Sequence, residues 1–352
     1  MRKRVAQRYT INTEFIGAKN MFTLKSTPQF PYMYYSDEMS EEMSIFQSAE
    51  MQRCFFTNSL VYAVPKHMSP CTISVLDDNT PVLIFPLLAN DSKAELAGHA
   101  NGICELSPIY FKSSEKKLKQ YLKFFLETSN YSEYSLTRIR ESTQLCCILN
   151  EGIAGYDISA MYRDNVSIDF SCGYDSWFQS LSKSTRQNLR TAYNRLEKDC
   201  KSVRVEVSNG RHLTHSLMNK LLDIYIKRHD ERYKVKTSAL KSVYLRYLDF
   251  STRALLNNPR AFHVYIFISD RVAGFCSGYL DNDVFIVPRL SIDNDFARYS
   301  PGYLLINEAI KWFSLNSNIH TIDLSEGAEK YKLDLGGTDY KKVDYTIKRT
   351  KN

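Results

Sequence analysis

The sequence contains no apolar run near the roughly 20 residues that a transmembrane helix needs, and its longest apolar stretches, VLIFPLL and VYIFI, are typical of buried strands. No apolar stretch follows the basic start MRKRVAQRYT, so we expect no secretory signal and a cytoplasmic protein. The eight cysteines include no C-x-x-C pair, which favours reduced thiols over a disulfide framework. His212 and His215 form the one close histidine pair, and no cysteine or carboxylate lies at ligand-like spacing around them, so we expect no metal site.

What the sequence does contain is an ordinary globular composition with one local excess of positive charge. Of its 352 residues, 43% are hydrophobic and 24% are charged, which allows one large domain or two medium ones. The net charge of +7 is concentrated in one stretch, where Glu197 and Asp199 oppose the basic residues Lys183, Arg186, Arg190, Arg195, Lys198, Lys201 and Arg204. Such a strip indicates an anionic partner, namely cofactor phosphates, an acidic sugar nucleotide or nucleic acid. For any single one of these residues a solvated helix face is the simpler interpretation.

The first half of the chain has strand-like runs and one clear helix. The runs cover Leu60–Pro65, Thr72–Leu88 and Lys93–Gly98, and the second of them predicts a hairpin around the turn DDNT. Apolar residues recur with helical spacing in SEKKLKQYLKFFLETS, which predicts a helix over Ser114–Ser129. The runs YSLTRI and TQLCCILN that follow are expected to be strands.

The second half has more regular patterns. Two helices are expected over YDSWFQSL and SKSTRQNLRTAYNRLEKD, then the strand VRVEVS, and then two further helices near Leu213–Arg232 and Ala239–Asn257. From His263 onward three strands form a meander, followed by a helix and by the strand His320–Ser325, which is parallel to the third if the helix crosses over. The alternating KVDYTIKR predicts a final edge strand.

The loop and helix after the meander, NDFARYSPGYLLINEAIKWF, raise the question of phosphate binding. Ser300 is a suitable N-cap and Pro301 a suitable first helical residue, which already explains the segment without a ligand. However, a helix start has unpaired amides and partial positive charge, and Gly302 has no side chain to hold a phosphate away from them. Arg298 adds a full charge just outside.

The strands on either side of this helix suggest where the rest of a phosphate-bearing ligand could lie. If DVFIVPRLSI and HTIDLS are parallel and splay apart, the gap between them can hold an extended chain against exposed backbone groups. A diphosphate at the helix start and a long amide-bearing arm between strands together describe coenzyme A.

At this point four segments resemble the GNAT acyltransferases, and most closely the cellulose-biosynthesis-type (CelD or BioF2-like) branch, which is related to the FemAB-type transferases. The segments are WFQSLSKSTRQNLRTAYNRLEKD, IYIKRHDERY with Arg228, IDNDFARYSPGYLLINEAI and IDLSEGAEKYKLDLGG. They extend from about Val166 to the end of the chain. In the general GNAT loop, Gln/Arg-x-x-Gly-x-Gly/Ala, Gly302 matches the last glycine and Ser300 stands in place of the middle one, as is usual for this branch.

The resemblance implies an α/β fold of tandem GNAT-like domains, each a mixed, mostly antiparallel sheet flanked by helices, with a splayed parallel strand pair in the second. Residues 1–165 would be a degenerate copy, and residues 166–352 the acyltransferase domain. It also implies acetyl-CoA or another acyl-CoA as co-substrate, with no metal. The residues expected to bind it are Ser291, Ile292, Arg298, Ser300, Gly302 and Tyr303, where backbone amides near Ser291 and Ile292 could also serve the oxyanion.

Acyl transfer from a thioester needs a base for the acceptor and an acid for the departing thiolate. Asp323 and Glu326 are the candidates for the base, although Asp323 serves equally well as a structural partner of an arginine. Tyr331 lies where GNAT proteins often place the acid, although a core tyrosine is an equal explanation. The side chains expected to hold an anionic substrate or cofactor phosphates are Arg186, Arg190, Arg228 and Lys332, with Arg186 and Arg228 matching the family pattern best.

Three functions remain open at this stage. The first is an acyl-CoA-dependent N- or O-acyltransferase whose small-molecule acceptor belongs to cell-envelope or exopolysaccharide metabolism, such as an amino sugar on a nucleotide carrier. The second is an aminoacyl-tRNA-dependent transferase of FemAB type, in which the basic helix from Lys183 contacts RNA. The third is a catalytically degenerate GNAT module that binds a partner or nucleic acid. We favour the first, with no nucleic-acid partner, because no long antiparallel helical arm is visible in the sequence.

Overall fold

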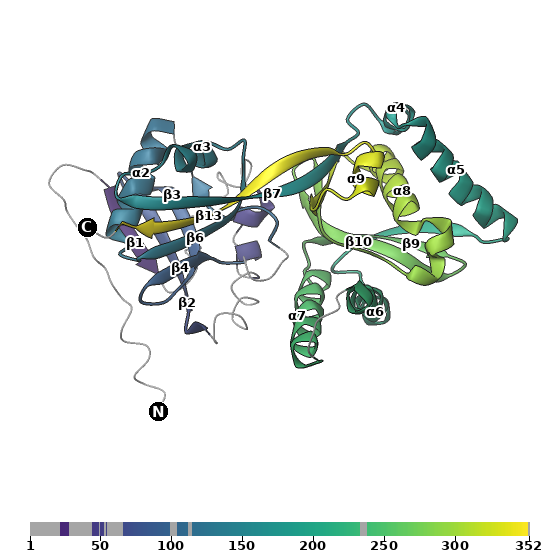
Figure 1. Ribbon diagram of the computed structural model, residues 1–352, viewed down its shortest axis with the longest axis horizontal. Coiled ribbons are helices and arrows are strands. Elements are labelled where there is room, and N and C mark those ends of the chain that lie inside the picture. Colours follow the sequence, from purple (N-terminus) through teal and green to yellow (C-terminus); the bar gives the residue numbers. More distant parts are fainter. Residues whose placement is uncertain are drawn as a thin grey trace. The chain divides into compact units, whose positions relative to one another are not determined.

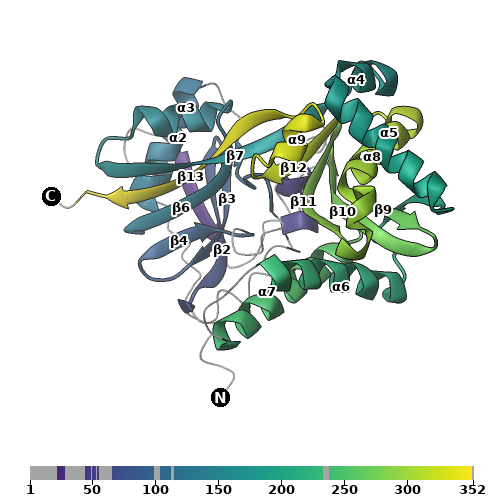
Figure 2. The same ribbon diagram turned by 45° about the vertical axis from the view of Figure 1, so that its right-hand side comes forward.

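The computed structural model describes residues 22–27, 44–48, 50–52, 54, 66–98, 104–111, 115–232 and 238–350, with the backbone alone at 115, 232 and 238–240. The strand expected at Leu60–Pro65 lies outside this part. The chain divides into unit 1, Met1–Arg163 with Lys341–Asn352, and unit 2, Asp164–Tyr340 (Figure 1, Figure 2). Both units are mixed α/β, as expected. No helix within the described residues is long and apolar enough to cross a membrane.

Unit 1 is built on a mostly antiparallel sheet. Its strand order is β1 (Phe22–Thr27), β2 (Ser69–Asp77), β3 (Thr80–Ala89), β4 (Lys93–Leu96), β6 (Glu133–Arg140) and β13 (Thr338–Arg349), and the short β5 (Tyr110–Phe111) pairs with β3. The hairpin expected over Thr72–Leu88 is present as β2 and β3. Its turn residues Asp78 and Asn79 have φ angles of 48° and 63°, the left-handed values that a tight hairpin turn requires.

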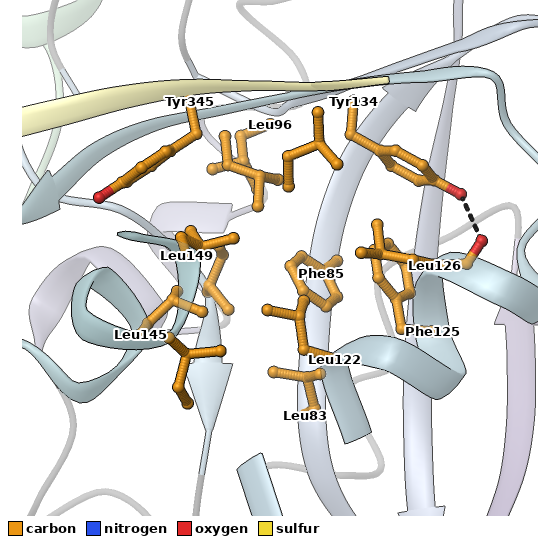
Figure 3. Packing of buried hydrophobic residues seen from close by; sticks show 14 of the residues in the cluster. Leu83, Phe85, Leu96, Leu122, Phe125, Leu126, Tyr134, Leu145, Leu149 and Tyr345 are labelled. Atoms are coloured by element: carbon orange, nitrogen blue, oxygen red, sulfur yellow. Dashed lines mark hydrogen bonds between the residues drawn. The ribbon is translucent and has the colours of Figure 1, made fainter. Parts of the chain in front are cut away.

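The helices α2 (Glu115–Thr128) and α3 (Gln144–Glu151) bury their apolar faces on this sheet, while the short η3 (Ile45–Gln47) precedes β2. In the core, Phe85 of β3 stacks on Phe125 of α2 with ring centroids 3.9 Å apart (Figure 3). The buried hydroxyl of Tyr134 is hydrogen-bonded, because it donates to the Leu126 carbonyl at 3.2 Å (Figure 3) and lies 2.6 Å from the hydroxyl of Ser129, just after α2.

One prediction for unit 1 was wrong, because TQLCCILN forms the helix α3 and not a strand. The Thr143 side chain accepts a hydrogen bond from the Cys146 amide at 3.3 Å and so caps the helix start. Leu145, Ile148 and Leu149 are buried at helical spacing, a pattern that a short apolar run does not distinguish from a strand.

Unit 2 is a sheet with helices on both faces. Its strand order is β7 (Tyr156–Asp169), β12 (Thr321–Glu326), β11 (Val284–Ile292), β10 (Arg271–Asp281), β9 (Ala261–Ile268) and β8 (Val203–Asn209). On one face lie α6 (His215–Arg232) and α7 (Ser238–Leu256). On the other lie α5 (Lys183–Lys198) and α8 (Pro301–Asn316), as Figure 1 shows. α4 (Tyr174–Ser180) precedes α5, η6 (Asn294–Tyr299) precedes α8, and α9 (Lys330–Asp334) follows β12.

The meander expected from His263 onward is confirmed as β9, β10 and β11, and the expected helix begins at Pro301. The strand after that helix, β12, is parallel to β11, also as expected. The stripe formed by Leu304, Leu305 and Ala309 is buried.

The last strand of the chain is not an edge strand, as its alternating pattern suggested. β13 lies between β6 and β7, and its four consecutive residues Lys342–Tyr345 are all buried. The chain thus passes into unit 2 through β7, which pairs with β12, and Lys341–Asn352 returns to unit 1, where β13 pairs with β6.

Candidate active site

The parallel pair β11 and β12 separates after three residues, although both strands are described throughout. The paired positions are Val284 with Thr321, Phe285 with Ile322 and Ile286 with Asp323, and no pair follows. A bulge in β11 explains the separation. Between the pairs Tyr279–Ile286 and Ser277–Arg289, the two residues Val287 and Pro288 lie opposite Gly278 alone.

Two residues fit this bulge for physical reasons. Pro288 has no amide hydrogen to donate to a neighbouring strand. A Cβ on Gly278 would lie 1.8 Å from the carbonyl oxygen of Ile286, so only glycine allows the two backbones to approach this closely.

The other strand of the pair is also irregular at this level. The pairing of β12 with β7 shifts register between Asp323 and Glu326, and Ser325 has a φ of 57°. The Asp323 carboxylate accepts a hydrogen bond from the Ser325 amide at 2.8 Å, which holds this bend. Beyond Ile286, therefore, the facing edges of β11 and β12 do not pair with each other.

Beyond the end of β11, the start of α8 lies close to this gap. Ser300 adopts a left-handed conformation with φ 52° and ψ 52°, and its carbonyl accepts from the Tyr303 and Leu304 amides at 3.0 and 3.2 Å. The Ser300 hydroxyl does not cap the helix, contrary to expectation, because an N-cap side chain reaches the first-turn amides from an extended backbone and not from a left-handed one. Among the described residues, no side chain caps this helix start.

Gly302 has space beside it. A Cβ at this position would meet only the Ile292 side chain, at an ordinary contact distance of 3.7 Å. Packing within the described residues therefore does not require glycine here. The same contact shows that Ile292, at the end of β11, lies next to the start of α8, as a site at this helix start would need.

The other predicted cofactor residues lie around this point. Arg298 is 63% exposed, and its guanidinium pairs with Asp199 at 2.9 Å and lies over the Tyr299 ring. The hydroxyl of Tyr303 donates to Asp334 at 3.0 Å, and burial, with the nearby carboxylate, raises the pKa of Tyr303 to about 12. The Tyr303 ring also meets the ring of Tyr331 edge to face, with centroids 6.4 Å apart.

The candidate catalytic groups differ in accessibility. Asp323 is 1% exposed and accepts a hydrogen bond from the Tyr340 hydroxyl, a partner that the sequence pattern did not indicate. Glu326, at the end of β12, is exposed. Tyr331 is half-buried at the edge of the unit 2 core.

The four predicted anion-binding cations have different environments. Arg186 donates to the carbonyls of Gln179 and Leu181, the latter at 2.8 Å, which fastens α5 to the end of α4. Arg190 is exposed on α5. Arg228 on α6 has a buried Nη1 without a hydrogen-bond partner in the described part of the chain.

Lys332 is 3% exposed, and its ammonium donates to the carbonyls of Leu324 at 2.9 Å, Glu326 at 2.9 Å and Gly327 at 2.8 Å, with the Glu329 carboxylate 3.0 Å away. These contacts close the loop after β12 and explain Lys332 without a substrate.

A further buried cation, Arg289, was not predicted as part of the site. It lies on β11 next to the bulge and donates to the Pro288 carbonyl at 3.0 Å and to the hydroxyls of Ser251 and Thr252 on α7, both at 3.2 Å. The signal was a charged residue within the otherwise apolar run DVFIVPRLSI.

Unit 1 contains a similar strand–helix–strand arrangement, but there the chain itself covers the strand edge beyond the parallel pairs. β4 and β6 are also parallel at three positions, Lys93–Glu133, Ala94–Tyr134 and Glu95–Ser135. After β4 the chain returns toward β6, where the Ser107 amide donates to the Arg138 carbonyl at 3.0 Å. Glu105 forms ion pairs with Arg138 at 3.7 Å and with the fully buried Lys342 at 3.5 Å. The chain itself therefore occupies the side of β6 that corresponds to the gap in unit 2.

Among the described residues, no group of three or more histidine, cysteine, aspartate or glutamate side chains could hold a metal ion. A hollow of about 490 Å³ lies against α7, lined by Lys241, Ser242, Leu245, Arg246 and Asp249, and none of these residues belongs to the candidate site.

Comparison with known proteins adds a family to this geometry. Residues 183–333 match the family model described as an acetyltransferase (GNAT) domain. No curated protein sequence matches the chain. Among solved structures, FemX is similar with a TM-score of 0.54 at 10% identity, over 83% of this chain and 90% of that one.

Two further structures are less similar. A conserved protein of unknown function from Bacteroides thetaiotaomicron VPI-5482 has a TM-score of 0.49 at 8% identity, over 91% of this chain and 100% of that one. A tandem GNAT protein from the clavulanic acid biosynthesis pathway has a TM-score of 0.43 at 12% identity, over 85% and 88%. The chain thus has a fold similar to that of FemX, and the residues that match the GNAT acetyltransferase domain model lie within unit 2.

Proposed function

We propose that the protein is an acyl-CoA-dependent N- or O-acyltransferase that uses acetyl-CoA, with a single site in unit 2. The observation that carries this proposal is the open gap between β11 and β12, which leads to an uncapped helix start where Gly302 leaves space beside the amides. Extended amide-bearing ligands pair with free strand edges, and diphosphates bind helix starts. In unit 1 the chain occupies the corresponding place, which supports a single site.

The residues of the site divide into three groups in this proposal. The start of α8 holds the diphosphate at Gly302, since the next amide, that of Tyr303, already donates to the Ser300 carbonyl; Arg298 lies beside this position and Ser300 forms the turn. The exposed edge of β11 up to Ile292 pairs with the pantetheine amides, and the amides near Ser291 and Ile292 stabilise the oxyanion. The acyl-CoA, when bound, supplies the thioester carbonyl that the acceptor attacks.

Proton transfer falls to the end of β12 and to α9. The attacking amine or hydroxyl forms the new bond to the acyl carbon and loses its proton, and in this proposal Glu326 takes that proton, which its exposure allows. Asp323 is buried, so it acts through the Tyr340 hydroxyl that it holds. As the carbon–sulfur bond breaks, Tyr331 gives its proton to the thiolate.

For the acceptor, the resemblance to the CelD or BioF2-like branch supports a small molecule of cell-envelope or exopolysaccharide metabolism, such as an amino sugar on a nucleotide carrier. Mass spectrometry of candidate sugar nucleotides incubated with the protein and acetyl-CoA tests this. A mass increase of one acetyl group identifies the acceptor, and treatment with hydroxylamine, which cleaves esters and spares amides, separates O- from N-acylation.

The test of the donor is the melting temperature with and without acetyl-CoA, for the wild type and for Gly302→Glu. Stabilisation of the wild type that the substitution abolishes supports the proposal. The alternative is an aminoacyl-tRNA-dependent transferase, favoured by the exposed cations Lys183, Arg190 and Lys198 on α5 and by the FemX-like fold. Salt-sensitive tRNA binding without any response to acetyl-CoA would establish that alternative, or a non-catalytic module, in place of the acyltransferase.

A further inference from the structure

Two buried polar groups near the end of β11 have no hydrogen-bond partner in the part of the chain that the structure describes. They are Nη1 of Arg228 on α6 and the hydroxyl of Ser291, a residue that is 0% exposed. Buried polar groups of native proteins are nearly always paired, so each unpaired one calls for a physical explanation.

The contacts of α6 place Arg228 over the end of β11. One turn before it, Tyr225 is buried against the sheet, and its ring lies 5.3 Å from the Arg289 guanidinium of β11. On either side of it in sequence, Lys227 pairs with Asp295 at 3.7 Å and Glu231 accepts from Asn294 at 2.6 Å. Since residues 294 and 295 directly follow β11, these contacts hold the turn of α6 from Lys227 to Glu231, which contains Arg228, beside the end of β11.

Ser291 lies on the same side of the sheet. Side chains alternate along a strand, so Ser291 shares its face with Arg289, two residues earlier, whose guanidinium contacts Tyr225 of α6 and hydroxyls of α7. Ile292 points to the opposite face, where it meets the position of Gly302 at the start of α8. The end of β11 therefore has the proposed diphosphate site on one face and these two unpaired groups on the other.

The chemistry of the two groups favours an anion. A guanidinium N–H can only donate, a hydroxyl can donate, and the buried cation Arg289 adds positive potential on the same face. The nearby carboxylates are already engaged, Glu231 by Asn294 and Asp295 by Lys227 and Arg271. A buried guanidinium nitrogen without a partner is costly, and a bound anionic oxygen would satisfy it.

We propose that Arg228 and Ser291 bind a carboxylate or phosphate group of the acceptor. This inference rests on the proposed function, because it places the acceptor on the α6 side of β11 and the acyl donor on the α8 side. The acceptor is then an amine or alcohol that carries its own negative charge, and its reactive group enters the gap between β11 and β12 from the face opposite the diphosphate.

The experiment uses the full chain, with Arg228→Met, Ser291→Ala and, as a charge-matched control on the exposed face of α6, Lys220→Met. Melting temperatures are measured without ligand, with inorganic phosphate, with sodium acetate at matched ionic strength, and with acetyl-CoA. We expect the wild type and Lys220→Met to be stabilised by one of the two anions. Phosphate indicates a phosphorylated acceptor, and acetate a carboxylated one.

Arg228→Met should melt at or above the wild-type temperature without ligand, since it removes a buried nitrogen that has no hydrogen-bond partner among the described residues. It should also lower the apparent affinity for the anion by tenfold or more. Ser291→Ala should weaken the response less. Arg228→Met should keep the response to acetyl-CoA.

The proposal is overturned if Arg228→Met melts well below the wild type without ligand, which would make Arg228 a structural residue, or if its response to the anion equals that of Lys220→Met. An anion response that depends on Arg228 in a protein without any response to acetyl-CoA would refute the acyltransferase assignment and leave the anion site standing. When an acceptor is known, Arg228→Met should raise its KM at least tenfold and leave the KM for acetyl-CoA unchanged.

Discussion

Replacing Gly302 with glutamate should make the free protein slightly more stable and should abolish its binding of acetyl-CoA. The free protein has room for the new side chain, since a Cβ here meets only the Ile292 side chain at 3.7 Å. Removing a helical glycine gains up to about 1 kcal/mol, and a negative charge in the first turn gains about 0.3–1 kcal/mol. A net gain near 1 kcal/mol raises the melting temperature by about 2 °C for a domain of this size.

The affinity of Gly302→Glu for coenzyme A should fall, and by more free energy than the stability of the free protein rises. A carboxylate about 4 Å from a phosphate costs about 1 kcal/mol in water and about 4 kcal/mol at the effective dielectric constant of a protein surface. The loss of affinity is therefore roughly 5-fold to 1000-fold. Isothermal titration calorimetry with coenzyme A measures it, and Leu315→Glu is the control, because it adds the same charge at the far end of α8, where the side chain is 74% exposed.

Two results would refute the reasoning. If Gly302→Glu lowers the melting temperature of the free protein by several degrees, the space beside Gly302 is not available to a side chain. If it binds coenzyme A as tightly as Leu315→Glu does, the diphosphate does not lie at the start of α8.

Three further predictions concern the rest of the molecule. Calorimetry should find one coenzyme A per chain, because Cys104–Ile109 runs where unit 1 would need an open gap, and a second site of similar affinity would contradict this. Lys332→Met should lower the free energy of unfolding, measured in urea, by about 3 kcal/mol, because three carbonyls lose their buried donor. The control Lys330→Met changes a side chain that is 85% exposed and should lower it by less than about 1 kcal/mol. Equal effects of the two substitutions would disprove the structural role of Lys332. Burial lowers the pKa of His263 to about 4, so the unfolded chain binds more protons between pH 6.5 and 4, and the free energy of unfolding should fall by about 3 kcal/mol as pH drops through this range. His263→Asn should remove most of that dependence, and an unchanged pH profile would show that other groups cause it.

The sequence predicts the elements whose patterns are local. The meander β9–β11 and the start of α8 at Pro301 follow from alternation, turn residues and helix signals that lie within a few residues of one another. The helix α3 could not be predicted in this way, because TQLCCILN is too short for its apolar period to distinguish a helix from a strand.

The roles of single side chains were harder to predict than the elements. The sequence predicts Lys332 and Arg186 as cations that hold a substrate, and it gives no sign of the backbone carbonyls to which both donate, because only the folded chain brings these carbonyls to them. The bulge at Val287 and Pro288 could be inferred from the proline inside an apolar strand. Its partner Gly278, and the hydroxyl of Tyr340 on Asp323, depend on the register between strands, which the sequence alone does not give.

The return of β13 to unit 1 also affects how the protein folds during synthesis on the ribosome. One edge of β6 is paired only after β13 has been made, and the Arg138 amide of β6 donates to the carboxylate of Asp344, 206 residues later, at 2.8 Å. Unit 1 therefore cannot complete its sheet until almost the entire chain has been translated. During this time an unpaired edge is available to chaperones or to a neighbouring nascent chain, and a fragment that stops before Thr338 would keep that edge open permanently.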